Sequence, residues 1–196
     1  MILWINGAFG SGKTTSAYEL HRRLPQSFVY DPENIGFFLF KNMPRRLRMK
    51  DFQDHPQWRL FNYEMLKDIA GRFDGVIIAP MTVTNPQYFD EIIGRLRREG
   101  IEVQHYILYA ERPTLEKRLN KLLRRGETWA KAQIDRCLQA FDHHITDEKI
   151  MTDHLNIDAV VQEIAARSGL VLLPDHRSPL KKWKDRIHTL LRHIRM

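Results

Sequence analysis

One glycine-rich segment near the N-terminus constrains the fold of this chain more than any other feature. Residues 7–14 read GAFGSGKT and match the spacing G-x-x-x-x-G-K-T, with an apolar stretch (2–6) before them and a helix-forming stretch (13–24) after them. In a strand–loop–helix unit, glycines let backbone N–H groups turn inward around phosphate oxygens, and the helix N-terminus adds a positive dipole. The segment therefore predicts a phosphate-binding P-loop, the alternative being a turn that only resembles one.

The motif assigns roles to particular side chains. Lys13 is expected to contact the β- and γ-phosphates of ATP, and the Thr14 hydroxyl to ligate Mg²⁺. The residues predicted to bind the nucleotide are Gly7, Ala8, Phe9, Gly10, Ser11, Gly12, Lys13, Thr14 and Thr15.

Predicted strands and helices alternate along the chain. Strands are expected at 2–6, 27–31, 75–81, 103–109 and 149–152, and helices at 13–24, 56–73, 86–99, 113–125, 130–141 and 157–167. In the helix at 56–73, Leu60, Phe61, Met65, Leu66 and Ile69 recur at helical spacing. The alternation predicts an α/β fold of the P-loop NTPase type, with three layers and a mainly parallel sheet.

Charge divides the chain of 196 residues unevenly. Of the net charge of +7, residues 177–196 carry +6, from seven Lys and Arg against one Asp, so residues 1–176 carry only +1. We therefore expect the basic charge to belong to a tail and expect no nucleic-acid partner. The predicted organisation is a domain at 1–169, a linker at 170–177 and an amphipathic helix at 178–196.

Two further observations bear on the cellular location. Cys137 is the only cysteine and cannot form an internal disulfide, and the longest apolar run (76–81) is far too short to span a membrane. We expect a cytoplasmic protein.

Other P-loop classes fit less well than the nucleotide-kinase-like class. A GTPase would carry N-K-x-D, but Asn120-Lys121 is followed by two leucines. A short chain that has its loop at residue 7 favours the nucleotide-kinase-like class. However, the strand at 76–81 lacks the terminal Asp that usually serves magnesium.

Asp31 is the candidate replacement for that missing acid. It follows the second strand, and the carboxyl ends of parallel strands face the ligand crevice. There it would act as a general base or a metal anchor. The alternative is that Asp31 caps the helix that begins near Pro32.

A basic cluster follows the fourth strand. It comprises Arg112, Lys117, Arg118, Lys121, Arg124 and Arg125, and Arg136 comes from the next helix. Nucleotide kinases close an arginine-bearing lid over the transferred phosphoryl group, and Arg118 and Arg125 lie on one helix face. These two are the candidate catalytic arginines, and a solvated helix face is the alternative.

The stretch between the second and third strands is rich in aromatic residues: Phe37, Phe38, Phe40, Phe52, Trp58, Phe61 and Tyr63. In this architecture the region commonly covers the acceptor substrate. Most of these side chains are expected in the core, and Trp58 and Arg59 are weak candidates for substrate contacts.

The tail predicts one amphipathic helix. Its apolar stripe comprises Leu180, Trp183, Ile187, Leu190, Leu191 and Ile194, and the opposite face carries Lys181, Lys182, Lys184, Arg186, Arg192 and Arg195. Such a helix is typical of an anionic membrane surface. A helix docked on the domain through the same stripe is the alternative.

Several motifs together resemble the bacterial tunicamycin-resistance ATP-binding proteins. They are Trp4 to Thr14, Tyr30-Asp31-Pro32-Glu33, Asp51-Phe52-Gln53, Pro80-Met81-Thr82, Tyr88-Phe89, Gln133 to Cys137, and Thr152-Asp153. The resemblance covers nearly the whole chain. It implies an ATP-binding protein that protects against tunicamycin, a lipid-bearing uridine nucleoside antibiotic, and that associates with the inner face of the cell membrane.

Two functions remain open at this point. The first is an enzyme that transfers a phosphoryl group from MgATP to a nucleoside-like hydroxyl, using Lys13, Thr14, Asp31 and the lid arginines. The second is a binding protein that sequesters tunicamycin in an ATP-dependent manner without turnover, and the missing strand-end acid favours it. A kinase for another small molecule is a variant of the first.

Overall fold

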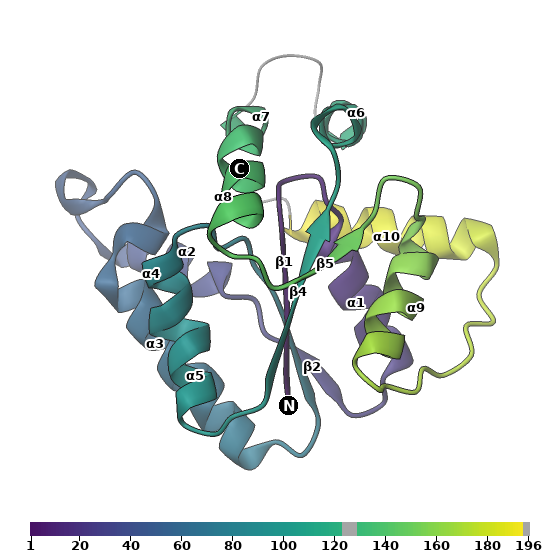
Figure 1. Ribbon diagram of the computed structural model, residues 1–196, viewed down its shortest axis with the longest axis horizontal. Coiled ribbons are helices and arrows are strands. Elements are labelled where there is room, and N and C mark those ends of the chain that lie inside the picture. The colour runs from purple at the N-terminus through teal and green to yellow at the C-terminus, as the bar shows by residue number, and fades with distance from the viewer. Residues whose placement is uncertain (123–128, 194–196) are drawn as a thin grey trace.

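A parallel five-stranded sheet forms the centre of the computed structural model, which describes residues 1–122 and 129–193 (Figure 1). The strands are β1 (Ile2–Gly7), β2 (Ser27–Val29), β3 (Val76–Pro80), β4 (Val103–Tyr109) and β5 (Glu148–Met151). Their order is β2-β3-β1-β4-β5, and every neighbouring pair is parallel. The predicted parallel α/β fold is confirmed.

Helices cover both faces of the sheet, as Figure 1 shows. Their bounds are α1 (Lys13–Arg23), α2 (Glu33–Asn42), α3 (Pro56–Arg72), α4 (Pro86–Phe89), α5 (Arg95–Arg98), α6 (Arg112–Leu122), α7 (Trp129–Ala132), α8 (Ile134–His143), α9 (Ile157–Arg167) and α10 (Pro179–His193). A π-helical turn, Asp90–Gly94, joins α4 to α5, so the helix predicted at 86–99 forms with one irregular turn. Helix α2 was not among the helices predicted by range.

Strand β1 divides the core into two layers because its side chains alternate between the two faces of the sheet. Ile2 and Trp4 pack in the cluster that includes α3, whereas Leu3 and Ile5 pack in the cluster that includes α1 and α9. All four are fully buried, which places β1 in the middle of the molecule with its glycine-rich end at the carboxyl edge of the sheet.

Helix α3 forms as predicted, but the apolar side chains at helical spacing divide between core and surface: Leu66 is fully buried and Ile69 packs against the core. Leu60 is 46% exposed and Met65 is 45% exposed, while Trp58 and Tyr63 are fully buried. Polar side chains share the inward face, and each has a partner: Asn62, for example, accepts from the Tyr30 hydroxyl at 2.8 Å. A buried face that satisfies its polar groups by hydrogen bonding carries no simple hydrophobic period.

The segment before α10 lies along the end of α1. Leu173 N donates to Arg23 O at 2.9 Å, and Arg23 Nε donates back to Leu173 O at 2.8 Å. Leu170 and Leu172 pack against the core cluster that contains α9. Residues 170–177, expected as a linker, are therefore fixed against the domain.

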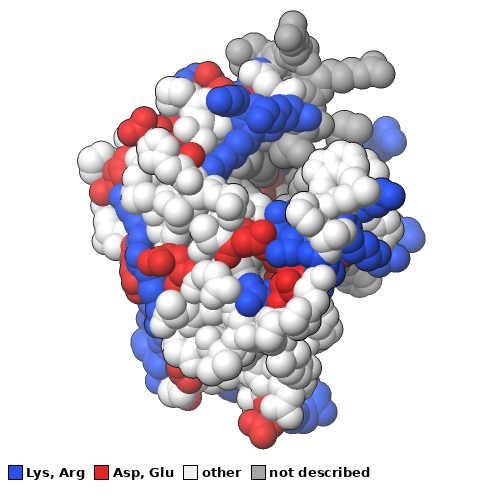
Figure 2. Space-filling view, turned by 90° about the vertical axis from the view of Figure 1, so that its right-hand side faces the viewer, with Lys and Arg blue, Asp and Glu red and all other residues white. Residues whose placement is uncertain are grey.

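Helix α10 docks through its charged edge rather than through its apolar stripe. Arg177, just before the helix, pairs with the carboxylate of Glu19, and Arg186 lies 2.7 Å from Asp158. Glu19 is buried in α1. Figure 2 shows this face, where acidic and basic side chains lie side by side across the middle.

The apolar stripe of α10 points away from the domain. Leu180 is 62% exposed, Trp183 is 60% exposed and Leu191 is 72% exposed. Helix α10 is docked on the domain, as the alternative expected, but these three side chains do not make the contact. Ile194 and Arg195 lie outside the described residues. No helix in the described ranges has the length and apolar content needed to cross a bilayer.

Candidate functional site

The glycine-rich loop runs from the end of β1 to the start of α1, where the motif requires it. Gly10 and Gly12 adopt φ values of 82° and 99°, which side chains with a Cβ rarely adopt. A Cβ on Gly7 would lie 2.6 Å from Leu108 O on the neighbouring strand. The loop conformation therefore depends on glycine at all three positions.

The loop presents polar groups that suit phosphate oxygens. Lys13 Nζ donates to Gly7 O at 3.0 Å and to Ala8 O at 3.1 Å, and burial lowers its pKa to about 8. Within the described part of the chain, no group forms a hydrogen bond with the buried Ser11 hydroxyl. A desolvated cation and an unsatisfied hydroxyl beside a glycine cradle fit a polyphosphate group.

The residues just beyond β3 hold this loop by hydrogen bonds from a hydroxyl and a backbone N–H, where a carboxylate would usually stand. Thr82 stands just beyond β3, where a magnesium-binding acid was missing from the sequence, and its hydroxyl donates to Gly7 O at 2.8 Å. Asn6 Oδ1 accepts from Gly7 N at 2.8 Å and from Val83 N at 3.0 Å. These contacts fix the first glycine of the loop between β1 and β3.

Two acidic residues stand at the start of α2. Burial lowers the pKa of Lys13, and the charge of Glu33, in the first turn of α2, opposes this shift. Asp31 Oδ1 accepts from Glu33 N at 3.0 Å, which is how a residue ahead of a helix caps it. The capping interpretation of Asp31 is thus satisfied in the structure. Glu33 was missed as a candidate, although the Asp-Pro-Glu sequence placed it in the first turn.

Helix α8 packs beside the loop. Cys137, on α8, is fully buried in one core cluster with Ala8 of the loop. Burial raises the pKa of Asp51, and the charge of Arg136, also on α8, opposes this by a smaller amount.

The two weak candidates on α3 have structural partners. Trp58 is fully buried and donates from Nε1 to Pro32 O at 3.0 Å. Arg59 forms an ion pair with Glu91, and its guanidinium lies 4.3 Å from the ring centre of Tyr88. Both residues hold the aromatic stretch together and are not free to contact a substrate directly.

Helix α6 packs directly on the loop, which brings one predicted arginine near it. A Cβ on Gly10 would lie 3.1 Å from Leu119 Cγ. Arg118, one residue earlier, donates from Nη1 to Thr152 Oγ1 at 3.0 Å and so ties α6 to the end of β5. Arg125, the other candidate lid arginine, lies outside the described residues, as does Arg124.

An aromatic pair borders the loop next to α7. The rings of Phe9 and Trp129 meet edge to face with centroids 5.0 Å apart, and Lys13 Nζ lies 5.6 Å from the Phe9 centroid. Trp129 remains 61% exposed. Exposed aromatic surface beside a phosphate-binding loop can stack on a planar ring of a ligand. The sequence analysis assigned Phe9 to nucleotide binding but did not single out Trp129.

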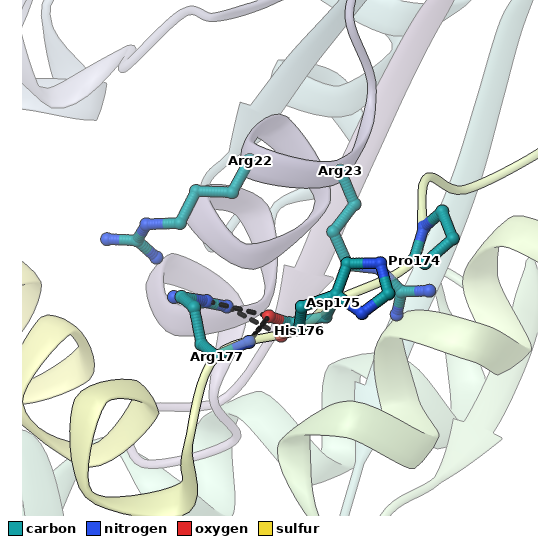
Figure 3. Close-up of a pocket in the computed structure, with 6 residues that line it drawn as sticks. All are labelled: Arg22, Arg23, Pro174, Asp175, His176 and Arg177. Atoms are coloured by element: carbon teal, nitrogen blue, oxygen red, sulfur yellow. Dashed lines mark hydrogen bonds and ion pairs between the residues drawn. The ribbon is translucent and has the colours of Figure 1, made fainter.

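A pocket lies away from this loop, at the far end of α1 (Figure 3). It has a volume of about 530 Å³ and is lined by Arg22, Arg23, Pro174, Asp175, His176 and Arg177. Arg177 is bonded to Asp175, as the dashed lines in Figure 3 show, and Arg23 is bonded to Leu173 O. The positive groups here stabilise the contact between α1 and the segment before α10.

A parallel sheet whose first strand ends in a glycine loop, with a lysine at the start of the next helix, defines a P-loop protein of the kinase-like class. The chain belongs to the AAA domain family (AAA_33), whose model matches residues 2–144. Among curated protein sequences no match is found.

Solved structures extend the comparison. The tunicamycin resistance protein of Deinococcus radiodurans is similar over 89% of this chain and 99% of that chain, at 29% identity and a TM-score of 0.74. The resemblance seen in the sequence is thereby confirmed.

More distant structures share the fold. A shikimate kinase from Bacteroides thetaiotaomicron matches over 87% of this chain and 99% of that chain (18% identity, TM-score 0.59). A sugar kinase from Janibacter sp. matches over 87% and 95% (15% identity, TM-score 0.61). At these identities the likeness shows the fold alone.

Proposed function

We propose that this protein transfers a phosphoryl group from MgATP to a hydroxyl group of a nucleoside-like small molecule, with tunicamycin as the leading candidate substrate. The observation that carries the proposal is the glycine loop between β1 and α1, in which Lys13 Nζ donates to the carbonyls of Gly7 and Ala8 beside the unsatisfied Ser11 hydroxyl. Such a loop offers a cation and hydrogen-bond donors to the phosphates of a nucleotide. The tunicamycin-resistance neighbour supports the choice of substrate class.

The residues of the loop would bind and orient the nucleotide. Bound MgATP supplies the transferable phosphoryl group, with Mg²⁺ shielding its charge. Residues 7–15 would surround the phosphates, Lys13 would exchange the carbonyls of Gly7 and Ala8 for phosphate oxygens, and Thr14 would approach the metal. Arg118, on the helix that contacts Gly10, and Arg125 would neutralise developing charge from the lid.

The acidic residues at the start of α2 would serve the acceptor. Asp31, proposed from the sequence as a base or metal anchor, also caps α2, and the two roles are compatible because a carboxylate has two oxygens. Glu33, in the first turn of α2, is a second candidate base. The general base must lie within hydrogen-bond reach of the acceptor hydroxyl.

The second part of the proposal is location. We infer that α10 rests on the anionic inner face of the cell membrane through residues 178–196. Its apolar stripe is exposed, Trp183 suits an interfacial depth, and Lys181 and Lys184 remain exposed beside the stripe. A lipid-bearing nucleoside would be encountered at that surface.

One observation favours a second candidate, a protein that sequesters the drug without turnover. The position beyond β3 that usually provides a magnesium-binding acid holds Thr82, whose hydroxyl is bonded to Gly7 O. A nucleotide would then act as a gate for drug binding.

Mass spectrometry of tunicamycin after incubation with the full-length protein and MgATP distinguishes a phosphotransferase from a sequestering protein. A mass gain of one phosphate, absent with Lys13→Ala, supports the enzyme. Unmodified drug that co-purifies with the protein supports sequestration, and unmodified drug that does not bind contradicts tunicamycin as the substrate.

A further inference from the structure

The net charge of residues 1–176 is only +1, but these residues include a second strongly basic surface. Residues 41–50, here called the basic loop, contain five Lys and Arg and no acid: Lys41, Arg45, Arg46, Arg48 and Lys50. Subtracting the +5 of the basic loop and the +6 of residues 177–196 from the chain's +7 leaves −4 for the rest. The expectation that the basic charge belongs to the tail alone is therefore wrong.

The cations of the basic loop have no acidic partner. All five are exposed, and within residues 1–122 and 129–193 none forms an ion pair. Arg48 Nε donates at 3.0 Å to the neutral carbonyl of Met43. By contrast, Arg59 pairs with Glu91 and Arg98 with Asp90. The positive charge of the basic loop is thus directed at the surroundings of the protein.

Large apolar side chains stand among these cations. Leu47 is 58% exposed and Met49 is 46% exposed, and Phe38, on the adjoining α2, is 55% exposed. The order Arg46-Leu47-Arg48-Met49-Lys50 alternates charge with apolar surface. A soluble surface seldom concentrates exposed apolar side chains in this way unless they contact a partner.

The basic loop is a folded projection with a fixed base. Its turn (η1, Arg45–Leu47) is closed by Leu47 N donating to Pro44 O at 2.9 Å, and Met49 N donates to the buried His55 Nε2 at 3.1 Å. The next turn (η2, Phe52–Asp54) anchors in the aromatic cluster, with Phe52 and Trp58 centroids 5.7 Å apart. Figure 1 shows the basic loop projecting at the left, on the opposite side of the sheet from α10.

We propose that the basic loop binds the surface of an anionic phospholipid membrane, with Leu47 and Met49 entering the headgroup region. Unpaired cations complement anionic headgroups, and interspersed apolar side chains gain from partial burial in the interface. Nucleic acid would use the cations but leave the exposed leucine and methionine unburied. The inference concerns the domain itself and holds whether or not α10 contacts the membrane.

The basic loop leads directly into a segment that is fixed to the domain. Residues 51–54 continue from it, and Arg59, from α3, donates to Gln53 O at 2.7 Å. A membrane contact at the basic loop would therefore be passed to the packed part of the domain.

Co-sedimentation of the full-length protein with vesicles tests the charge. The vesicles contain equal parts of phosphatidylglycerol and phosphatidylcholine, or phosphatidylcholine alone. Arg45→Glu with Arg46→Glu is compared with Lys117→Glu with Lys121→Glu, which makes the same change in net charge at exposed positions of α6. Each basic residue at an anionic surface strengthens binding about five-fold. We expect the affinity of the basic-loop variant for anionic vesicles to fall at least about ten-fold. The affinity of the control variant should fall less than about three-fold.

A second measurement tests whether the basic loop enters the headgroup region of the membrane. Cys137 is buried, so Met49→Cys can be labelled selectively with a polarity-sensitive fluorophore, with Val171→Cys as the exposed control. We expect a blue shift on adding anionic vesicles at position 49 and none at position 171. Circular dichroism confirms that each variant is folded.

The outcomes separate this inference from the proposed function. Loss of vesicle binding in the basic-loop variant, with binding retained when Leu180 and Trp183 are replaced by Ser, supports the basic loop and removes α10 from the membrane contact. Unchanged vesicle binding in the basic-loop variant overturns the inference and leaves α10 as the contact. If the basic-loop variant binds vesicles unchanged but no longer binds a short DNA or RNA duplex, the inference is overturned and the basic loop is a nucleic-acid-binding surface.

Discussion

The side-chain amide of Asn6 lies 3.1 Å from Nε2 of His105, and this contact couples the P-loop to β4. Asn6 Nδ2 also donates to Val83 O at 2.9 Å, so its second N–H faces the imidazole and requires Nε2 to accept. His105 Nδ1 lies 3.0 Å from Asp147 Oδ2 and carries the ring proton. Burial lowers the pKa of His105, which favours this neutral form.

Replacing His105 removes the acceptor for the Asn6 amide. We expect His105→Phe to lower the free energy of unfolding by about 1–3 kcal/mol, because a buried N–H loses its partner. Urea denaturation measures the change, with the exposed His154→Phe as the control, and binding of MgATP should weaken in the same variant because Asn6 also holds Gly7 N. Equal stability of the two variants would show that the contact does not support the loop.

Nucleotide binding should take up a proton at Lys13. Burial lowers the pKa of free Lys13 to about 8, and adjacent phosphates favour its charged form and raise the pKa. Affinity should therefore be constant well below pH 8 and fall as the pH rises above it, with uptake of about half a proton at pH 8. Calorimetry at pH 8 in two buffers of different ionisation enthalpy measures the uptake. Identical binding enthalpies in the two buffers would contradict the shift.

The acids at the start of α2 can be separated by amide substitutions. Asn caps a helix about as well as Asp, so Asp31→Asn should preserve folding and MgATP binding. If Asp31 is a base or metal anchor, this variant loses tunicamycin resistance; if Glu33 is the base, Glu33→Gln loses it instead. Growth on tunicamycin and MgATP affinity are measured for both variants. Full resistance in both would refute a catalytic carboxylate at this position.

The contact between α1 and α10 depends on one buried carboxylate. Glu19 lies 2.8 Å from Arg22 and 3.6 Å from Arg186, and it also pairs with Arg177. Glu19→Gln removes the buried carboxylate from these arginines, of which Arg177 retains Asp175 and Arg186 retains Asp158. The substitution should cost about 2 kcal/mol of unfolding free energy. It should also speed tryptic cleavage within residues 177–193.

The matched control for that substitution is Glu163→Gln, which breaks an exposed pair with Arg167. A surface pair of this kind contributes at most about 1 kcal/mol. If both variants lose the same stability and α10 is cleaved no faster, Glu19 does not hold the helix.

The parts of the fold that the sequence predicted share a simple physical origin. Strand β3 (Val76–Pro80) is largely buried and reads as a continuous apolar run, and the glycine loop has a spacing set by phosphate geometry. The apolar stripe of α10 also stands out in the sequence, and its Leu180, Trp183 and Leu191 are exposed in the structure.

The features that were not predicted from the sequence depend on contacts between segments far apart in the chain. The inward face of α3 includes Arg59 and Asn62, whose polar groups are satisfied only after Glu91 and Tyr30 fold against them. The charge of Glu33 affects Lys13 only after the two segments that carry them fold together. The basic loop was overlooked because its charge was summed with acids on other surfaces.

Calorimetric titration of MgATP into the wild-type protein and into Lys13→Ala tests the central claim most directly. Charge-assisted hydrogen bonds of this kind contribute about 1.5–3 kcal/mol, so the affinity of the variant should fall at least about ten-fold while the protein remains folded. A folded Lys13→Ala protein that binds MgATP as tightly as the wild type would contradict the assignment of residues 7–14 as the nucleotide site.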